Sequence, residues 1–491
     1  MSTHPTPDAA AARTLGRALR NAGYSEDAIY DLLGEDAYSV DRDDASVEAR
    51  RLPQTPLATV IRAIFLQLSV ERADAVRALG PRGVEALAAT GLAEVGDHVT
   101  PRSRILPVGK VLLASDGFSL DADDPADYVA TYTPTAQVLD SLTPRAQIER
   151  ALDVGTGSGI HALLAAQHAR NVVATDVNER ALAYTSLNAV LNGLDNIEVR
   201  RGSLFEPVAG ESFDLITCNA PYVVSPERRW AYRDSGFEAD ELSQRVVREA
   251  AAHLAEGGFA TVQVSWLARD EEHADDRIVE WVEAAGYDSW IMPTLSLDAL
   301  EHAAEWNSHL YGRQLTDALD VWTTYFAELG VHWVSEGVVI LHRRPGAEPT
   351  LRLDPVDEDA LEDAGDQIRR AFAARTRLAS LNGRDELLDA RLSLAMNVRL
   401  EEELEPDDDG GVIVAGGRVD LTEGTRHDVE TTSEALEVVA ALDSRLSLGE
   451  IVNATAERLE LSDAEQIRFR REAVRLSREL LELGALELRG G

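Results

Sequence analysis

The stretch that decides the fold runs from Glu149 to Tyr222. It opens with ERALDVGTGSGIHALLAA (residues 149–166) and closes with DLITCNAPYVV (residues 214–224). The opening letters predict a short apolar strand at Ala151 to Val154, then a glycine-rich turn, then a helix rich in alanine and leucine. A strand that passes through glycines into a helix is typical of a turn that holds a nucleotide.

The turn carries glycines at alternating positions, Gly155, Gly157 and Gly159. Glycines lack the Cβ atoms that would keep a ligand away from the backbone, and the helix behind them presents unpaired N–H groups to a carboxylate or phosphate. About twenty residues later the chain repeats strand and helix, with Asp176 at the end of the predicted strand. There a carboxylate can accept both hydroxyls of a ribose.

Alone, this pair of features leaves the ligand open. NAD, FAD and S-adenosylmethionine all use such a turn, and a tight turn without a ligand is also possible. The spacing here is G-x-G-x-G, whereas the dinucleotide fingerprint is G-x-G-x-x-G. In addition, a fourth predicted strand, Phe213 to Cys218, ends in Asn219-Ala220-Pro221-Tyr222.

With these motifs in this order, the chain resembles the class I S-adenosylmethionine-dependent methyltransferases. It is most similar to the "methyltransferase small domain" group with an Asn-Pro-Pro-Tyr-type motif. That group includes release-factor glutamine methyltransferases and several rRNA guanine-N2 and tRNA adenine-N6 methyltransferases. The resemblance spans roughly Leu112 to Arg344 and implies S-adenosyl-L-methionine as the cofactor. The residues that it implies for cofactor binding are Thr133, Thr135, Asp153, Gly155, Gly157, Gly159, Asp176, Ser203, Leu204 and Asn219.

Two of these implied contacts depart from the family pattern or match it loosely. Thr133 and Thr135 lie where the family folds a segment over the methionine end of the cofactor, and Thr133 also reads as the N-cap of a helix that starts at Pro134. At the end of the third strand the relatives often carry an acid that binds the adenine amino group. This chain has Ser203 there, so adenine recognition would rely on Ser203 and Leu204.

The residues implied for catalysis are Asn219, Ala220, Pro221 and Tyr222. An amide or exocyclic amine is a poor nucleophile, because its lone pair is delocalised. Two acceptors that take its N–H bonds would help absorb the charge that develops in the transition state. The side-chain oxygen of Asn219 and the carbonyl of Ala220 would be these acceptors, and Tyr222 would stack on the planar group. The family usually has proline at position 220, but the acceptor there is main chain and Pro221 keeps that residue extended.

The nature of the substrate stays open at this point. Acidic residues outnumber basic ones by 86 − 47 = 39, which disfavours a polyanion and leans toward a protein. Against this, Arg228, Arg229 and Arg233 lie beside Trp230 and Tyr232, a mixture that could hold RNA or DNA. We expect a macromolecular substrate, because predicted modules without chemistry of their own flank the core. The alternatives are a non-catalytic cofactor-binding scaffold and, less favoured, an NAD-dependent oxidoreductase.

Composition limits other kinds of site. The single cysteine, Cys218, permits no intramolecular disulfide, and its place in a strand predicts a buried core residue. No His, Cys or Glu cluster has metal-ligand spacing, so no metal site is expected. No apolar run reaches membrane-spanning length and the N-terminus does not resemble a secretory signal, so a cytoplasmic location is expected.

The alternation of elements predicts an α/β protein with a Rossmann-like, doubly wound sheet of seven strands. We expect three regions: a helical, winged-helix-like module at 1–110, the methyltransferase core at 111–345 with a helical insertion at 296–329, and an accessory region at 346–491 that ends in a second winged-helix-like module. Smaller expectations are a linker at 36–54, a solvated loop at Glu401 to Gly411, and capping boxes at Thr431/Glu434, Ser447/Glu450 and Ser462/Glu465.

Overall fold

The computed structural model describes residues 5, 8–118, 124–226, 237–344, 346, 348–381, 384–406 and 412–489. The chain packs into two compact units. The first comprises Met1–Leu139, Ala146–Ala285 and Leu295–Val339, and the second comprises Asp140–Arg145, Gly286–Thr294 and Ile340–Gly491. Within the described ranges, no helix combines the length and the apolar character that a membrane-spanning segment needs. The three predicted regions remain a proposal.

A central sheet carries the candidate site, and its strands follow the order β13-β11-β12-β10-β9-β6-β7-β8. The pairs β6·β7, β6·β9, β7·β8, β9·β10 and β11·β13 are parallel. The predicted α/β class is confirmed, with eight strands where seven were expected, because a short β13 pairs with β11. The strands are β6 Ile148–Val154, β7 Ala169–Asp176, β8 Ile197–Arg201, β9 Phe213–Cys218, β10 Leu254–Ala268, β11 Asp288–Asp298, β12 Trp333–His342 and β13 Leu351–Leu353.

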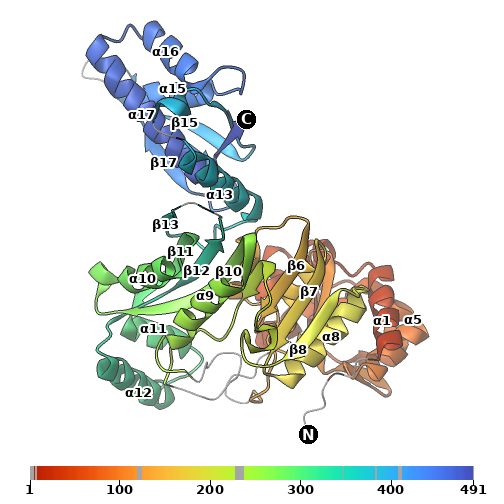
Figure 1. Ribbon diagram of the computed structural model, residues 1–491. Helices are drawn as coiled ribbons and strands as arrows, with labels where there is room; N and C mark the ends of the chain where they lie inside the picture. The colour runs from red at the N-terminus through yellow and green to blue at the C-terminus, as the bar shows by residue number, and fades with distance from the viewer. Residues whose placement is uncertain are drawn as a thin grey trace. The chain divides into compact units, whose positions relative to one another are not determined.

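The strand order reverses at β6, which lies between β7 and β9 (Figure 1). In open parallel sheets, ligands bind in the crevice outside the carboxyl ends of the strands at such a reversal. The glycine turn follows β6, Asp176 ends β7, and Asn219 follows β9. The topology therefore brings the three predicted motifs to one edge of the sheet.

Helices connect these strands and follow the predicted pattern. Asn178 caps the helix after β7 by accepting from the backbone N–H of Arg180, and Gly193 ends that helix with a left-handed φ of 72°. The helices are α6 Pro134–Ser141, α7 Ile160–Ala165, α8 Glu179–Asn192, η4 Glu206–Val208, α9 Glu241–His253, η5 Glu271–His273, α10 Asp276–Ala285, α11 Ala299–Trp306 and α12 Arg313–Leu329. The helices α11 and α12 lie within the range predicted as a helical insertion, 296–329.

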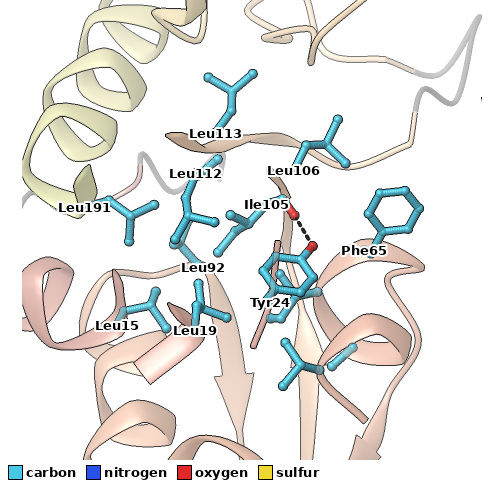
Figure 2. Close-up of a cluster of buried hydrophobic side chains, with 14 of the residues drawn as sticks. Leu15, Leu19, Tyr24, Phe65, Leu92, Ile105, Leu106, Leu112, Leu113 and Leu191 are labelled. Atoms are coloured by element: carbon cyan, nitrogen blue, oxygen red, sulfur yellow. Dashed lines mark hydrogen bonds between the residues drawn. The ribbon is translucent and has the colours of Figure 1, made fainter. Parts of the chain in front are cut away.

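The N-terminal part of the first unit combines helices with short antiparallel strands. Figure 2 shows its leucine-rich core, where the Tyr24 hydroxyl donates to the backbone oxygen of Ile105 at 2.6 Å. A turn at Gly96-Asp97 joins two of the strands, β2 and β3. The elements are α1 Ala9–Asn21, α2 Glu26–Leu33, η1 Glu35–Ser39, α3 Arg42–Arg51, α4 Pro56–Val60, η2 Ile61–Phe65, β1 Val70–Glu71, α5 Arg72–Ala89, β2 Ala93–Val95, β3 His98–Pro101, β4 Ser103–Val108 and β5 Val111–Asp116.

The linker predicted at 36–54 is wrong, because this segment contains η1 and the helix α3. Asp41 caps α3 by accepting from the backbone N–H groups of Asp43 and Asp44. Ala45 and Ala49, four residues apart, bury one side of the helix. Alanine is a weak marker of burial, so the charged residues around this pair concealed an amphipathic helix.

The second unit continues after β12 with helices and short strands. Its elements are α13 Gly365–Ala379, α14 Arg384–Leu388, β14 Arg391–Leu394, β15 Val398–Pro406, β16 Val412–Leu421, β17 Asp428–Thr431, α15 Ser433–Ala440, α16 Leu448–Arg458, α17 Asp463–Glu482 and β18 Leu486–Arg489. The capping boxes that start at Ser447 and Ser462 are confirmed. The box predicted at Thr431 is wrong by one residue, because Thr432 is the N-cap and accepts from the backbone N–H of Ala435.

The solvated loop predicted at Glu401 to Gly411 is also corrected in part. Residues 401–406 belong to β15, which pairs with β16, and residues 407–411 lie outside the described residues. The side chains of 402–406 are exposed, while Glu401 accepts from Arg418 of the neighbouring strand at 2.9 Å. Solvent exposure was therefore predicted correctly, but backbone pairing across the hairpin was not.

Candidate active site

The glycine turn meets the Asn219 motif directly. Gly155 and Gly157 have φ values of 66° and 55°, a region that favours glycine. A Cβ built on Gly155 would lie 3.4 Å from Cα of Ala220, so the turn after β6 touches the motif after β9. A Cβ built on Gly157 would have the backbone oxygen of Gly155 as its nearest atom, 4.0 Å away. Space therefore remains open beside Gly157, as a backbone that is to contact a ligand requires.

Gly159 serves a different purpose from its two neighbours. Its φ is 92°, and a Cβ there would lie 2.9 Å from the side chain of Thr185 on α8. Thr185 in turn donates from Oγ1 to the backbone oxygen of Gly157 at 3.1 Å. Gly159 thus lets α8 pack closely against the turn, and in this structure its Cα faces protein.

Asp153 lies at the end of β6 with 1% of its surface exposed. Its Oδ2 accepts from Thr156 Oγ1 at 2.6 Å and from the Ala162 N–H at 3.1 Å, and its Oδ1 accepts from Thr217 Oγ1 at 2.9 Å. Burial raises the pKa of this carboxyl, while the nearby His161 and these hydrogen bonds oppose the rise. The carboxylate therefore braces the turn, α7 and β9 against one another from below the candidate site.

Asp176 lies beside the turn from the other strand. Its Oδ2 accepts from the Gly157 N–H at 3.0 Å and its Oδ1 accepts from the Asn178 N–H at 2.8 Å. Burial raises its pKa, and backbone donors, with Asn178 and Gly157 foremost, oppose that rise. A half-buried carboxylate is thus fixed next to the open space at Gly157, as the sequence order predicted.

The turn after β8 lies beside the end of β7, next to Asp176. The backbone oxygen of Leu204 accepts from Thr175 Oγ1 at 3.1 Å, and the Gly202 N–H donates to the backbone oxygen of Asp176 at 3.0 Å. Leu204 has a left-handed φ of 49° and Ser203 precedes it. The structure therefore places Ser203 and Leu204 next to the end of β7, beside Thr175 and Asp176.

Thr133 and Thr135 stand at the start of α6. Thr133 Oγ1 accepts from the Ala136 N–H at 3.2 Å, and the two threonine hydroxyls lie 3.0 Å apart. These hydrogen bonds stay within the first turn of the helix. The N-cap interpretation of Thr133 is therefore confirmed, and no hydrogen bond among the described residues joins either threonine side chain to the glycine turn.

Residues 219–222 follow β9 at the carboxyl edge. Asn219 and Pro221 are half-buried, Ala220 is buried, and Tyr222 is 7% exposed. Ser265 of β10 donates from Oγ to the backbone oxygen of Tyr222 at 2.5 Å. The segment is thus held against β10, and little of the Tyr222 ring is open for stacking.

The helical insertion provides the wall behind Tyr222, which the sequence interpretation missed. Tyr222 packs in a buried cluster with Trp322 and Phe326 of α12, and Ala303 of α11 joins the same cluster. Trp322 and Phe326 are four residues apart, and this helical spacing is a sequence signal for a buried face. The arginine loop at 228–233 lies outside the described residues.

Helix α8 ties the N-terminal elements to the glycine turn. Asn188 is fully buried; its Oδ1 accepts from the Ala114 N–H at 2.9 Å, and its Nδ2 donates to the backbone oxygens of Ala114 and Ser158 at 2.7 and 2.8 Å. Asn192, one turn later, forms the same pair of bonds with Leu112 of β5. The side chain of Asn188 therefore connects β5 with the glycine turn that would hold a cofactor.

A buried ion pair reinforces this connection. Asp116, at the end of β5, accepts from Arg180 Nε at 2.9 Å and from the Tyr184 hydroxyl at 2.7 Å, both on α8. It also accepts from the Val129 N–H at 2.9 Å, which holds the segment before α6.

Among the described residues, no cluster of His, Cys, Asp and Glu could hold a metal ion.

Comparisons with known proteins agree with the resemblance inferred from these motifs. Residues 133–268 match the family model described as Methyltransferase small domain, which confirms that resemblance. Residues 21–103 match a second model, described as Domain of unknown function (DUF7059).

Three similar relatives come from bacteria. The chain is 32% identical over 170 residues to a ribosomal protein uL3 glutamine methyltransferase of Bradyrhizobium diazoefficiens, covering 29% of this chain and 52% of that protein. It is 39% identical over 103 residues to a release factor glutamine methyltransferase of Aliivibrio fischeri, covering 20% and 36%. It is 30% identical over 183 residues to a release factor glutamine methyltransferase of Xylella fastidiosa, covering 34% and 66%. The chain thus spans about half the length of the curated relatives it matches.

Proposed function

We propose that this protein is an S-adenosyl-L-methionine-dependent N-methyltransferase that acts on the side-chain amide of a glutamine in a protein. The observation that carries the proposal is the contact between the glycine turn and the Asn219 motif, at 3.4 Å between a Cβ on Gly155 and Cα of Ala220. This contact brings the predicted cofactor site and the predicted acceptor site to one place. Two observations favour a protein substrate over nucleic acid. The net charge is −39, and the three relatives are named as glutamine methyltransferases of ribosomal protein uL3 or of release factors.

The residues around the turn fit the cofactor. Gly157 leaves open space on its Cβ side, and Asp176 offers a fixed carboxylate beside it for the ribose hydroxyls. Ser203 and Leu204 stand next to the end of the same strand, where the adenine would lie. When bound, S-adenosyl-L-methionine supplies the methyl group on a sulfonium centre. The oxygens of Asp153 already accept from three protein donors, so Asp153 would hold the glycine turn in place and would not contact the cofactor directly.

On the acceptor side, Asn219 and Ala220 would align the glutamine amide. The side-chain oxygen of Asn219 and the backbone oxygen of Ala220 would each accept one N–H of the acceptor nitrogen. Acceptors fixed in place before the reaction help most where charge develops in the transition state. Tyr222, which packs against Trp322 and Phe326 of α12, would form one side of the acceptor site. A substrate of the translation machinery would place the enzyme in the cytoplasm.

The test is transfer of labelled methyl from S-adenosylmethionine to purified release factor and to ribosomal protein uL3, with the modified residue located by mass spectrometry. Asn219→Ala should lower turnover by about 10²- to 10³-fold, because its interaction matters chiefly in the transition state. Its dissociation constant for S-adenosylmethionine, measured by calorimetry, should stay within about twofold of wild type.

Ala220→Pro is the matched control, because the change leaves the backbone acceptor where it was, and it should retain turnover. A wild-type protein that labels neither substrate would overturn the proposed substrates. In a lysate, label that survives protease but not nuclease would overturn the choice of a protein. Normal turnover by Asn219→Ala would overturn the amide-aligning mechanism.

A further inference from the structure

A polar face runs through the middle of the sheet toward the acceptor site. On β10, Thr261, Gln263 and Ser265 are buried and alternate with apolar residues, so the three side chains share one face of the strand. Thr261 is in register with Thr217 of β9, and Thr217 is in register with Asp153 of β6, to which it donates a hydrogen bond. Asp153, Thr217 and Thr261 therefore form one row across three strands, and Gln263 lies two residues further along β10 on the same face as Thr261.

The register of β9 and β10 brings Gln263 level with Asn219. The last residues that pair between the two strands are Cys218 and Val262. Asn219 follows the end of β9, and Gln263 is the next residue within β10, which continues to Ala268. Continued by one residue, the register therefore sets Gln263 level with the residue proposed to align the acceptor.

The amide of Gln263 is buried but unsatisfied. Only 2% of the residue is exposed, its Oε1 accepts no hydrogen bond, and its side chain makes none to any described residue. Its neighbour along the same face, Ser265, is by contrast bonded to the backbone oxygen of Tyr222. Buried polar atoms nearly always have a partner, because leaving one unpaired costs folding free energy.

We infer that Gln263 is a positioning residue for Asn219, an inference that rests on the proposed function. An asparagine amide has an acceptor oxygen and a donor NH₂ group, and it can present either one after a half-turn. Alignment of an acceptor N–H requires the oxygen of Asn219 to face it. When substrate binds, Gln263 Oε1 accepts from the NH₂ group of Asn219 and fixes the amide in that orientation. No hydrogen bond of the Asn219 side chain in the described structure competes with this one.

The test compares Gln263→Met with Gln263→Glu. Methionine has a similar length but no acceptor, whereas glutamate keeps an oxygen that can accept from Asn219. Gln263→Met should melt at or above the wild-type temperature and bind S-adenosylmethionine within about twofold of wild type, while kcat on the labelled protein substrate falls by about tenfold or more. Gln263→Glu should turn over faster than Gln263→Met.

Thr261→Val is the matched control. The Thr261 hydroxyl is also buried, unpaired and on the same face. It is level with Thr217, two residues before Asn219, and not with Asn219 itself. Its removal should likewise preserve the melting temperature, and kcat should not change. Equal loss of kcat in Thr261→Val would overturn the inference, because the effect would then belong to the polar face in general.

The remaining outcomes separate the inference from the proposed function. Wild-type kcat in Gln263→Met, or a melting temperature below wild type, would overturn the positioning role and leave the proposed function standing. A wild-type protein that binds no S-adenosylmethionine and labels neither release factor nor uL3 would overturn the proposed function and the inference with it.

Discussion

Two buried amides in the first unit, Asn188 on α8 and Gln263 on β10, have opposite environments. Asn188 is fully buried and its oxygen and nitrogen bond to Ala114 and Ser158 at 2.7 to 2.9 Å. Gln263 is 2% exposed and bonds to none of the described residues. A buried amide with all its partners stabilises the fold, whereas one without partners costs stability and requires another reason to be present.

The same difference separates the two sides of the candidate site. On the cofactor side, the Asp153 and Asp176 carboxylates accept from protein donors that hold the glycine turn in place. On the acceptor side, the side chains of Asn219 and Gln263 lie at the same edge without such partners. Protein donors therefore fix the proposed cofactor side in the structure, whereas we expect the substrate to complete the proposed acceptor side.

The largest effect is expected from Asn188→Leu. This change leaves the Ala114 N–H and the backbone oxygens of Ala114 and Ser158 buried without their partner. Each buried group left unpaired costs about 1–3 kcal/mol, so the free energy of unfolding should fall by about 3 kcal/mol or more. Equilibrium unfolding in urea measures the loss. In the same assay Gln263→Met should lose nothing.

The control for Asn188 is Asn171→Leu, a change at an exposed position of β7. It should alter the free energy of unfolding by no more than about 0.5 kcal/mol. If Asn188→Leu were no more destabilising than Asn171→Leu, or if Gln263→Met were the less stable variant, the contrast between the two amides would be void.

A smaller effect is expected from Asp176→Ala, measured as affinity for S-adenosylmethionine. The carboxylate holds the Gly157 N–H and is proposed to bind the ribose, so its loss should cost about 1–3 kcal/mol, or about 5- to 150-fold in Kd. Calorimetry measures the change, and Asp195→Ala, at an exposed position after α8, is the control. Wild-type affinity in Asp176→Ala would contradict ribose binding by this carboxylate and would leave it only the role of holding the glycine turn.

The sequence predicted elements whose signals are local. The strand Phe213–Cys218 has the expected bounds, and Asp176 stands at the end of its strand. Apolar runs bounded by turn residues, and capping boxes such as the one at Ser447, specify such elements over a few neighbouring residues. The order of motifs along the chain then placed them together, since parallel strands bring their carboxyl ends to one edge.

What the sequence could not predict depends on pairings far along the chain. The bonds of Asn188 join it to Ala114, 74 residues away. The packing of Tyr222 against Trp322 also depends on tertiary structure, as does the absence of a partner for Gln263. A glutamine in an apolar strand carries no local sign of whether its amide is satisfied. Only the register of β9 and β10 brings it level with Asn219.

The smallest effect is expected at Cys218, the residue before Asn219 at the end of β9. Burial raises the pKa of its thiol to about 12, against a modest opposing hydrogen bond from the Ala220 N–H. Since a raised pKa keeps the thiol neutral and burial limits access to it, the native protein should resist iodoacetamide. Mass spectrometry after treatment, with and without urea, measures this. A thiol makes only weak hydrogen bonds, so burial costs Cys218 little where it costs Gln263 more. Native labelling as fast as in urea would show that this end of β9 opens to solvent, which would contradict the burial inferred for Gln263 on the neighbouring strand.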